Sequence, residues 1–137
     1  MRQPVGNVVL VALAVCALAA CSGDKPVEVN PNIFPANYKN EILDTMTNTL
    51  GDPTNVRGAF ISDPVLTAVG QDQRYTVCVR YNARDANHAY MGSTDRIAYF
   101  FGGALNQLVE ATKEQCGNAA YKPFPELEKL CQGKTCH

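Results

Sequence analysis

The six cysteines are the residues of this chain with the widest chemical scope. Cys131 and Cys136 are followed directly by His137, and two thiols beside an imidazole match the wider form of the c-type haem attachment motif. No second histidine is well placed to be the other axial ligand, and oxidised cysteines cannot ligate zinc. The spacing therefore favours a disulfide over haem or metal, and we expect no cofactor.

Cys16 lies in a predicted export signal and Cys21 is a predicted lipidation site. Four cysteines therefore remain available for disulfides, namely Cys78, Cys116, Cys131 and Cys136. Four thiols permit three pairings, and the sequence alone leaves all three open. The favoured pairing joins Cys131 with Cys136, because a short loop closes readily, and leaves Cys78 with Cys116. Disulfides persist in oxidising compartments, so this pattern favours an exported protein.

Cys21 has a different predicted fate. Arg2 and the apolar run at residues 8–17 are typical of an export signal, and the run is too short to span a membrane. The sequence Leu-Ala-Ala-Cys at residues 18–21 matches a bacterial lipobox, in which the cysteine thiol is joined to diacylglycerol before cleavage. An ordinary secretory signal that contains a cysteine is the alternative.

Lipidation predicts both a cleavage site and a location. We expect residues 1–20 to be removed, and two or three acyl chains to hold Cys21 in a membrane on the periplasmic side of the cell envelope. Ser22 stands where an aspartate would retain a lipoprotein in the inner membrane. The outer membrane is therefore favoured over the inner membrane.

The sequence contains few residues and motifs of the kind that catalysis requires. The sequence contains two histidines, and it lacks the G-x-S-x-G, H-E-x-x-H and phosphate-loop motifs. We therefore predict no catalytic residues and no enzymatic activity.

Residues 82–95 are predicted to form a long loop between two strands, rich enough in polar side chains to bind a ligand. The candidate binding residues are Asn82, Arg84, Asp85, His88, Tyr90 and Arg96. The alternative is a solvated turn in which Asn82 and Asp85 hydrogen-bond to their own backbone.

The elements that would position these residues are indicated by proline content and apolar spacing. Three prolines within residues 21–35 predict an extended tether, and apolar residues three and four apart at 38–50 predict an amphipathic helix. Alternating side chains at 74–81 give the clearest strand, while 56–69 is expected to be a strand broken at Asp63-Pro64. Residues 97–101 and 104–109 flank Gly102-Gly103 as a hairpin, in which Tyr99 would oppose Asn106 and Ile97 would oppose Leu108.

These elements predict one α+β domain at residues 36–137. An N-terminal amphipathic helix would pack on an antiparallel sheet of about four strands, followed by a disulfide-stapled C-terminal segment.

Three short motifs resemble those of a group of small bacterial envelope lipoproteins. They are Asp52-Pro53-Thr54, then Val77-Cys78 through Asn82-Ala83-Arg84, and finally Tyr90-Met91-Gly92. The resemblance covers about residues 45–101. It implies a compact exported domain of unassigned function, with no catalytic residues to transfer to this chain.

Charge and composition narrow the classes of partner. The formal net charge is −1 and no run of like charge occurs, so a nucleic-acid surface is not expected. The leading hypothesis is a non-enzymatic module of the cell envelope that contacts a protein partner. The alternative is a module that recognises an anionic envelope component through residues 82–95, and the third possibility is a haem or redox protein built on the C-terminal cysteines.

Overall fold

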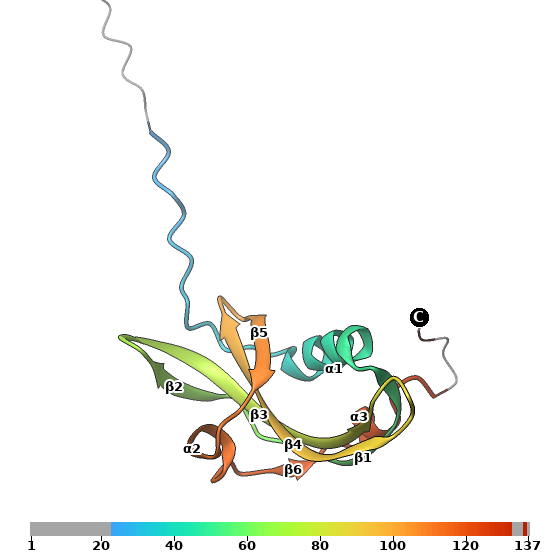
Figure 1. Cartoon of the computed structure of the whole chain (residues 1–137). Coiled ribbons are helices and arrows are strands. Elements are labelled where there is room, and N and C mark those ends of the chain that lie inside the picture. The colour runs from blue at the N-terminus through green and yellow to red at the C-terminus, as the bar shows by residue number, and fades with distance from the viewer. Residues whose placement is uncertain (1–22, 133–135, 137) are drawn as a thin grey trace, which may run out of the picture.

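The computed structural model describes residues 23–132 and residue 136, so Cys21, Ser22 and His137 lie outside it. Its elements, in chain order, are α1 (Tyr38–Thr49), β1 (Asp52–Ile61), β2 (Val65–Val69), β3 (Asp72–Arg84), β4 (Tyr90–Phe101), β5 (Ala104–Glu110), α2 (Lys113–Cys116), β6 (Lys122–Pro123) and α3 (Pro125–Glu128). The fold is mostly an antiparallel sheet with few helices (Figure 1). Within residues 23–132 and 136, none of the helices has the length and apolar composition of a membrane span.

The sheet has six strands, where the sequence predicted about four. Its order is β5-β4-β3-β1-β6, and β2 pairs with β3 beyond the end of the β1–β3 ladder. The long strand β3 therefore joins both parts of the sheet. In Figure 1 the sheet is curved, α1 lies over one side and α2 lies against the other. We call the side under α1 the inner face and the opposite side the outer face.

The alternation of β3 divides the core between these two faces. Val77 and Val79 are fully buried on the inner face. The inner cluster also contains Ile42 and Met46 of α1, Ala98 and Phe100 of β4, and Phe124 and Leu127 near α3. Each large apolar side chain buried in this way contributes about 1.5–3 kcal/mol to folding.

A smaller cluster on the outer face contains a disulfide. Cys78 of β3 is bonded to Cys116 of α2, with their Cα atoms 5.7 Å apart, and Ile97 packs against both. The second disulfide joins Cys131 to Cys136. These are the pairs that the sequence favoured. Thr112 begins α2 with a capping box, accepting from the backbone N–H of Gln115, and so places Cys116 over the sheet.

The hairpin register differs from the prediction by one residue. Phe101 is opposite Ala104, but a register shift between Tyr99 and Phe100 leaves Asn106 as an extra residue. As a result Tyr99 is opposite Gln107, and Ile97 is opposite Val109. The bulge has a packing reason, since it allows Leu105 and Leu108, three residues apart, both to pack against the inner cluster.

The predicted tether is shorter than residues 21–35. Residues 23–30 are exposed and extended, but Pro35 is fully buried and the Phe34 ring packs edge-on against Tyr75. Pro31 accepts a hydrogen bond of 3.1 Å from the backbone N–H of Gly102. Apolar contact with the hairpin outweighs the extended preference of the prolines in residues 31–35, so this segment belongs to the folded part.

The long loop predicted at residues 82–95 is also incorrect. β3 continues to Arg84 and β4 begins at Tyr90, so only residues 85–89 connect them. Polar side chains on the outer face of both strands gave this segment the appearance of a loop, while Ala83 is buried on the inner face.

Candidate functional site

Asp52, the first residue of β1, is the centre of a polar network. Its carboxylate accepts hydrogen bonds from the hydroxyl and the backbone N–H of Thr54. Nη2 of Arg84 lies 2.8 Å from Oδ2 of Asp52, and Nδ1 of His88 lies 2.7 Å from the same oxygen. The Asp52 side chain is 6% exposed, whereas that of His88 is 71% exposed. The network thus joins the start of β1 to both ends of the β3–β4 turn.

This environment stabilises the charged form of Asp52. The Thr54 hydroxyl has the largest effect, and together with His88, the Thr54 backbone and Arg84 it holds the pKa of the Asp52 carboxyl well below its usual range. The charge of Arg84 is therefore balanced within the molecule.

Replacement of Asp52 should make the free energy of unfolding less dependent on pH in the acid range. A carboxyl with a lowered folded-state pKa stabilises the fold fully above its unfolded value of about 3.9, and that contribution is lost as pH falls towards the folded pKa. We expect Asp52→Asn to lower the free energy of unfolding at neutral pH, and the difference from wild type to shrink below about pH 4. Urea unfolding at both pH values measures this.

Asp44→Asn on the exposed side of α1 is the control and should change little at either pH. A constant difference between Asp52→Asn and wild type from neutral to acid pH would contradict the assignment of a lowered pKa to Asp52.

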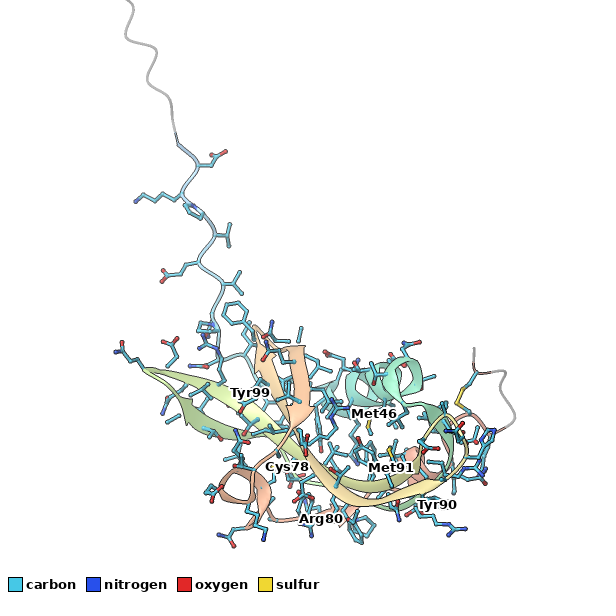
Figure 2. The ribbon with its side chains drawn as sticks, viewed as in Figure 1. Met46, Cys78, Arg80, Tyr90, Met91 and Tyr99 are labelled. Carbon is cyan, nitrogen blue, oxygen red and sulfur yellow. A yellow bond between two sulfur atoms is a disulfide. The ribbon has the colours of Figure 1, made fainter. Side chains whose placement is uncertain are left out.

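Tyr90 lies on the outer face beside this network. Its hydroxyl donates to the backbone oxygen of Asn55 at 2.7 Å, and the guanidinium of Arg57 lies 4.1 Å from the ring centroid. Figure 2 shows Tyr90 directed away from α1 and Met91 directed towards the α1 side. These two neighbouring side chains therefore lie on opposite faces of the sheet. Gly92, the next residue, has a φ of 96° and lies beside a register shift between β3 and β4.

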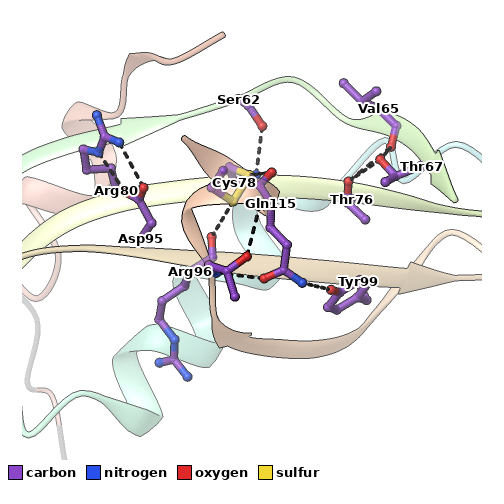
Figure 3. The surroundings of a disulfide bond; sticks show 12 residues. Ser62, Val65, Thr67, Thr76, Cys78, Arg80, Asp95, Arg96, Tyr99 and Gln115 are labelled. Atoms are coloured by element: carbon purple, nitrogen blue, oxygen red, sulfur yellow. Dashed lines mark hydrogen bonds and ion pairs between the residues drawn. A yellow bond between two sulfur atoms is a disulfide. The ribbon is translucent and has the colours of Figure 1, made fainter. Parts of the chain in front are cut away.

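A second arginine is fixed on the same face. Nε and Nη2 of Arg80 donate to the two carboxylate oxygens of Asp95 at 2.7 and 2.9 Å (Figure 3). The Arg80 guanidinium also lies 4.5 Å from the ring centroid of Tyr121. Burial, followed by the charge of Asp95, raises the pKa of Tyr121 to about 12. Phe60, opposite Arg80 in the β1–β3 ladder, is 38% exposed.

We name these side chains the arginine–aromatic face. It consists of Arg57, Phe60, Arg80, Tyr90 and Tyr121.

The structure brings only some of the predicted binding residues together. Arg84, His88 and Tyr90 lie around the Asp52 network. Asp85 accepts from two backbone N–H groups of its own turn, whereas Asn82 accepts from the backbone N–H of Gly92 on the neighbouring strand. Arg96 is apart from them, because its Nη2 donates to the backbone oxygen of Leu108.

Six residues of the network and the arginine–aromatic face were not predicted as site residues, namely Asp52, Thr54, Arg57, Phe60, Arg80 and Tyr121. Asp52 and Thr54 were noted only within a motif, although an aspartate two residues before a threonine is a frequent turn in which the carboxylate accepts the later N–H. Arg57 left no signal, because its stacking on Tyr90 depends on strand pairing. Among residues 23–132 and 136, no three His, Cys, Asp or Glu side chains are grouped as a metal site would require.

Comparison with known proteins found no relative of this chain. No protein-family model, no curated protein and no solved structure matches this chain.

Proposed function

We propose that this chain is a membrane-anchored bacterial lipoprotein whose folded part is a non-enzymatic interaction module of the cell envelope. In this proposal Cys21 carries the lipid, and the arginine–aromatic face contacts a protein partner. The outer membrane is the proposed location, on the basis of Ser22.

The segment between the lipobox and the sheet supports the proposed anchor. Residues 23–30 are exposed and extended, and in Figure 1 they lead away from the folded part. At about 3.1 Å per residue, residues 23–30 alone span about 25 Å between the folded part and the predicted lipid site. Two disulfides suit an oxidising compartment such as the periplasm.

The arginine–aromatic face is the observation that carries the interaction proposal. Tyrosine, phenylalanine and arginine are enriched at the centres of protein interfaces, and tyrosine and arginine dominate their binding energy. Asp95 and Tyr121 hold Arg80 in place, and Tyr90 holds Arg57. Side chains that are ordered before binding lose less conformational entropy when a partner docks.

An anionic envelope component is the second candidate ligand, and Arg57 favours it. Within the described residues Arg57 is exposed and forms no ion pair, so its charge is available to a carboxylate or phosphate. Arg84, one of the two arginines among the predicted binding residues, is instead paired with Asp52. Recognition of an anion would therefore be centred on Arg57.

Enzymatic and haem functions have less support. His88 contacts Asp52, but among its described contacts there is no serine or cysteine nucleophile. The disulfide between Cys131 and Cys136 occupies both sulfur atoms that haem attachment would need. We therefore assign no catalytic or cofactor-binding residue.

Photocrosslinking in intact cells tests the interaction proposal. A photoreactive residue at Ser93, which is exposed and paired with Asn82 beside the face, should form a specific adduct with an envelope protein. Arg57→Glu should weaken that adduct, because it reverses the charge at the proposed contact. The control position is Asn48, exposed on α1. Absence of an adduct at Ser93 would contradict the proposal. So would equal adducts from Ser93 and Asn48 whose yield does not change in Arg57→Glu.

A further inference from the structure

Within the described residues, the chain covers part of two edges of its own sheet. β6 pairs with β1 at Phe60 and Ile61, and Glu128 accepts the neighbouring backbone N–H of Ala59 at 3.0 Å. On the opposite edge, the carboxylate of Glu41 in α1 accepts the backbone N–H of Leu105 in β5. Such covering prevents edge strands from pairing with other chains.

The edge formed by β2 differs from both. β2 pairs with β3 alone, and within the described residues no other segment makes a backbone hydrogen bond to it. Its five residues, Val-Leu-Thr-Ala-Val, contain no charge and no proline. The side chains of Val65 and Leu66 are 58% and 41% exposed. β2 therefore lacks the usual devices that protect an edge strand, such as a lysine, a proline or an inward-pointing charge.

The backbone of β2 is also regular. Its ladder with β3 runs through consecutive pairs from Val65–Thr76 to Val69–Asp72 without a register shift. The β1–β3, β3–β4 and β4–β5 ladders each contain at least one. A regular edge presents its free N–H and C=O groups in the spacing that another strand needs.

There is space beside this strand on the outer face. A groove of about 480 Å³ is bordered by Val65 and Thr67 on one side and by residues 118–120 on the other, with Thr76 and Cys78 among its lining. Figure 3 shows Val65, Thr67 and Thr76 next to the disulfide, and Thr67 and Thr76 share a hydrogen bond of 2.8 Å. An added strand could therefore bring outward side chains alongside Val65.

We propose that β2 pairs antiparallel with β2 of a second copy of this chain, around a two-fold axis at Thr67. This register places Val65 opposite Val69 of the other copy and Leu66 opposite Ala68, so apolar side chains meet at each pair. The strand is nearly symmetric about Thr67 and uncharged, so self-pairing brings no like charges together. The partner's Val69 would then lie next to Val65 on the outer face.

Self-pairing of β2 also limits the assembly to two copies. Each copy uses the β2 edge once, and the symmetric contact closes on itself instead of propagating into a fibre. The pairing requires neither the lipid nor the arginine–aromatic face. If the chain is anchored as proposed, confinement to one membrane raises the effective concentration of copies and favours the dimer.

Cysteine crosslinking of the full chain in cells tests the proposal. In Thr67→Cys the new thiols of two copies face each other across the two-fold axis, at a Cα separation that permits a disulfide. We expect most of this variant to migrate as a dimer on non-reducing gels after thiol blocking, and as a monomer after reduction. Asn106→Cys, exposed on β5, is the matched control and should remain monomeric.

The register has its own control. Val65→Cys or Val69→Cys alone should give little dimer, whereas co-expression of the two variants should give the mixed dimer, because Val65 is opposite Val69. Failure of Thr67→Cys to crosslink, or equal crosslinking by Asn106→Cys, would overturn the proposal.

The mass of the full chain in detergent provides a second measurement. Wild type should be a dimer, and Thr67→Lys should be a monomer with an unchanged circular dichroism spectrum, because it places two positive charges face to face. A dimer that survives Thr67→Lys would overturn the assignment to β2. Arg57→Glu should leave the dimer intact, which separates this result from the fate of the proposed partner contact.

Discussion

Replacement of both Cys78 and Cys116 by alanine should lower the free energy of unfolding by about 4 kcal/mol. The bridge spans a sequence separation of 38 residues, so its loss frees a long loop in the unfolded chain. Cys116 is fully buried and Cys78 is 6% exposed, so the variant also loses packing against Ile97. Urea unfolding of the exported protein measures the effect, and the large loss should also reduce the amount recovered from cells.

The second disulfide is the matched control. Cys131 and Cys136 are separated by 5 residues, so the same entropy argument gives the double alanine variant a loss of only about 2 kcal/mol. The two double variants should therefore differ clearly in denaturation midpoint. Equal losses of unfolding free energy in the two variants would show that the Cys78–Cys116 bridge does not stabilise the fold by closing a longer loop.

Alternating apolar residues indicated part of the sheet from sequence. Val77 and Val79 are buried on the inner face, as expected for a strand with one apolar side. The sequence did not indicate that β3 continues to Arg84, because Asn82 and Arg84 lie on the outer face and suggest a loop. β6 was also missed, since two residues leave no periodic signal and form a strand only by pairing with β1.

Bulges limited the prediction of register and side-chain direction. The extra residue Asn106 shifts the hairpin by one position, and the shift beside Gly92 changes the direction of Tyr90. Both shifts depend on packing between segments, which a local turn motif such as Gly102-Gly103 does not encode.

The candidate site was only partly visible in the sequence for a related reason. The Asp52 network joins residues from the start of β1 and from the β3–β4 turn, separated by 36 positions between Asp52 and His88. Asn55 and His88 have φ values of 55° and 64°, a left-handed backbone that sequence patterns rarely reveal at residues other than glycine. Asp52, Thr54 and Arg84 fall in two short motifs that are far apart in the sequence, and the structure shows that they contact one another.

Cys21→Ala should have the largest effect of any single substitution on where the protein resides. In the proposed function the diacylglycerol is attached to the Cys21 thiol, so the variant cannot receive its lipid. Cys16→Ala is the control, because Cys16 lies within the predicted signal and would be removed with it. That variant should be lipidated and retained like wild type.

Fractionation of cells that express these two variants is the most direct test of the proposed anchor. We expect wild type and Cys16→Ala to be in the membrane fraction and to be labelled by a fatty-acid probe. Cys21→Ala should carry no label, and no membrane-bound protein of the mature mass should be found for this variant. A Cys21→Ala protein that stays membrane-bound at its mature mass, or a wild-type protein that takes up no label, would contradict the account.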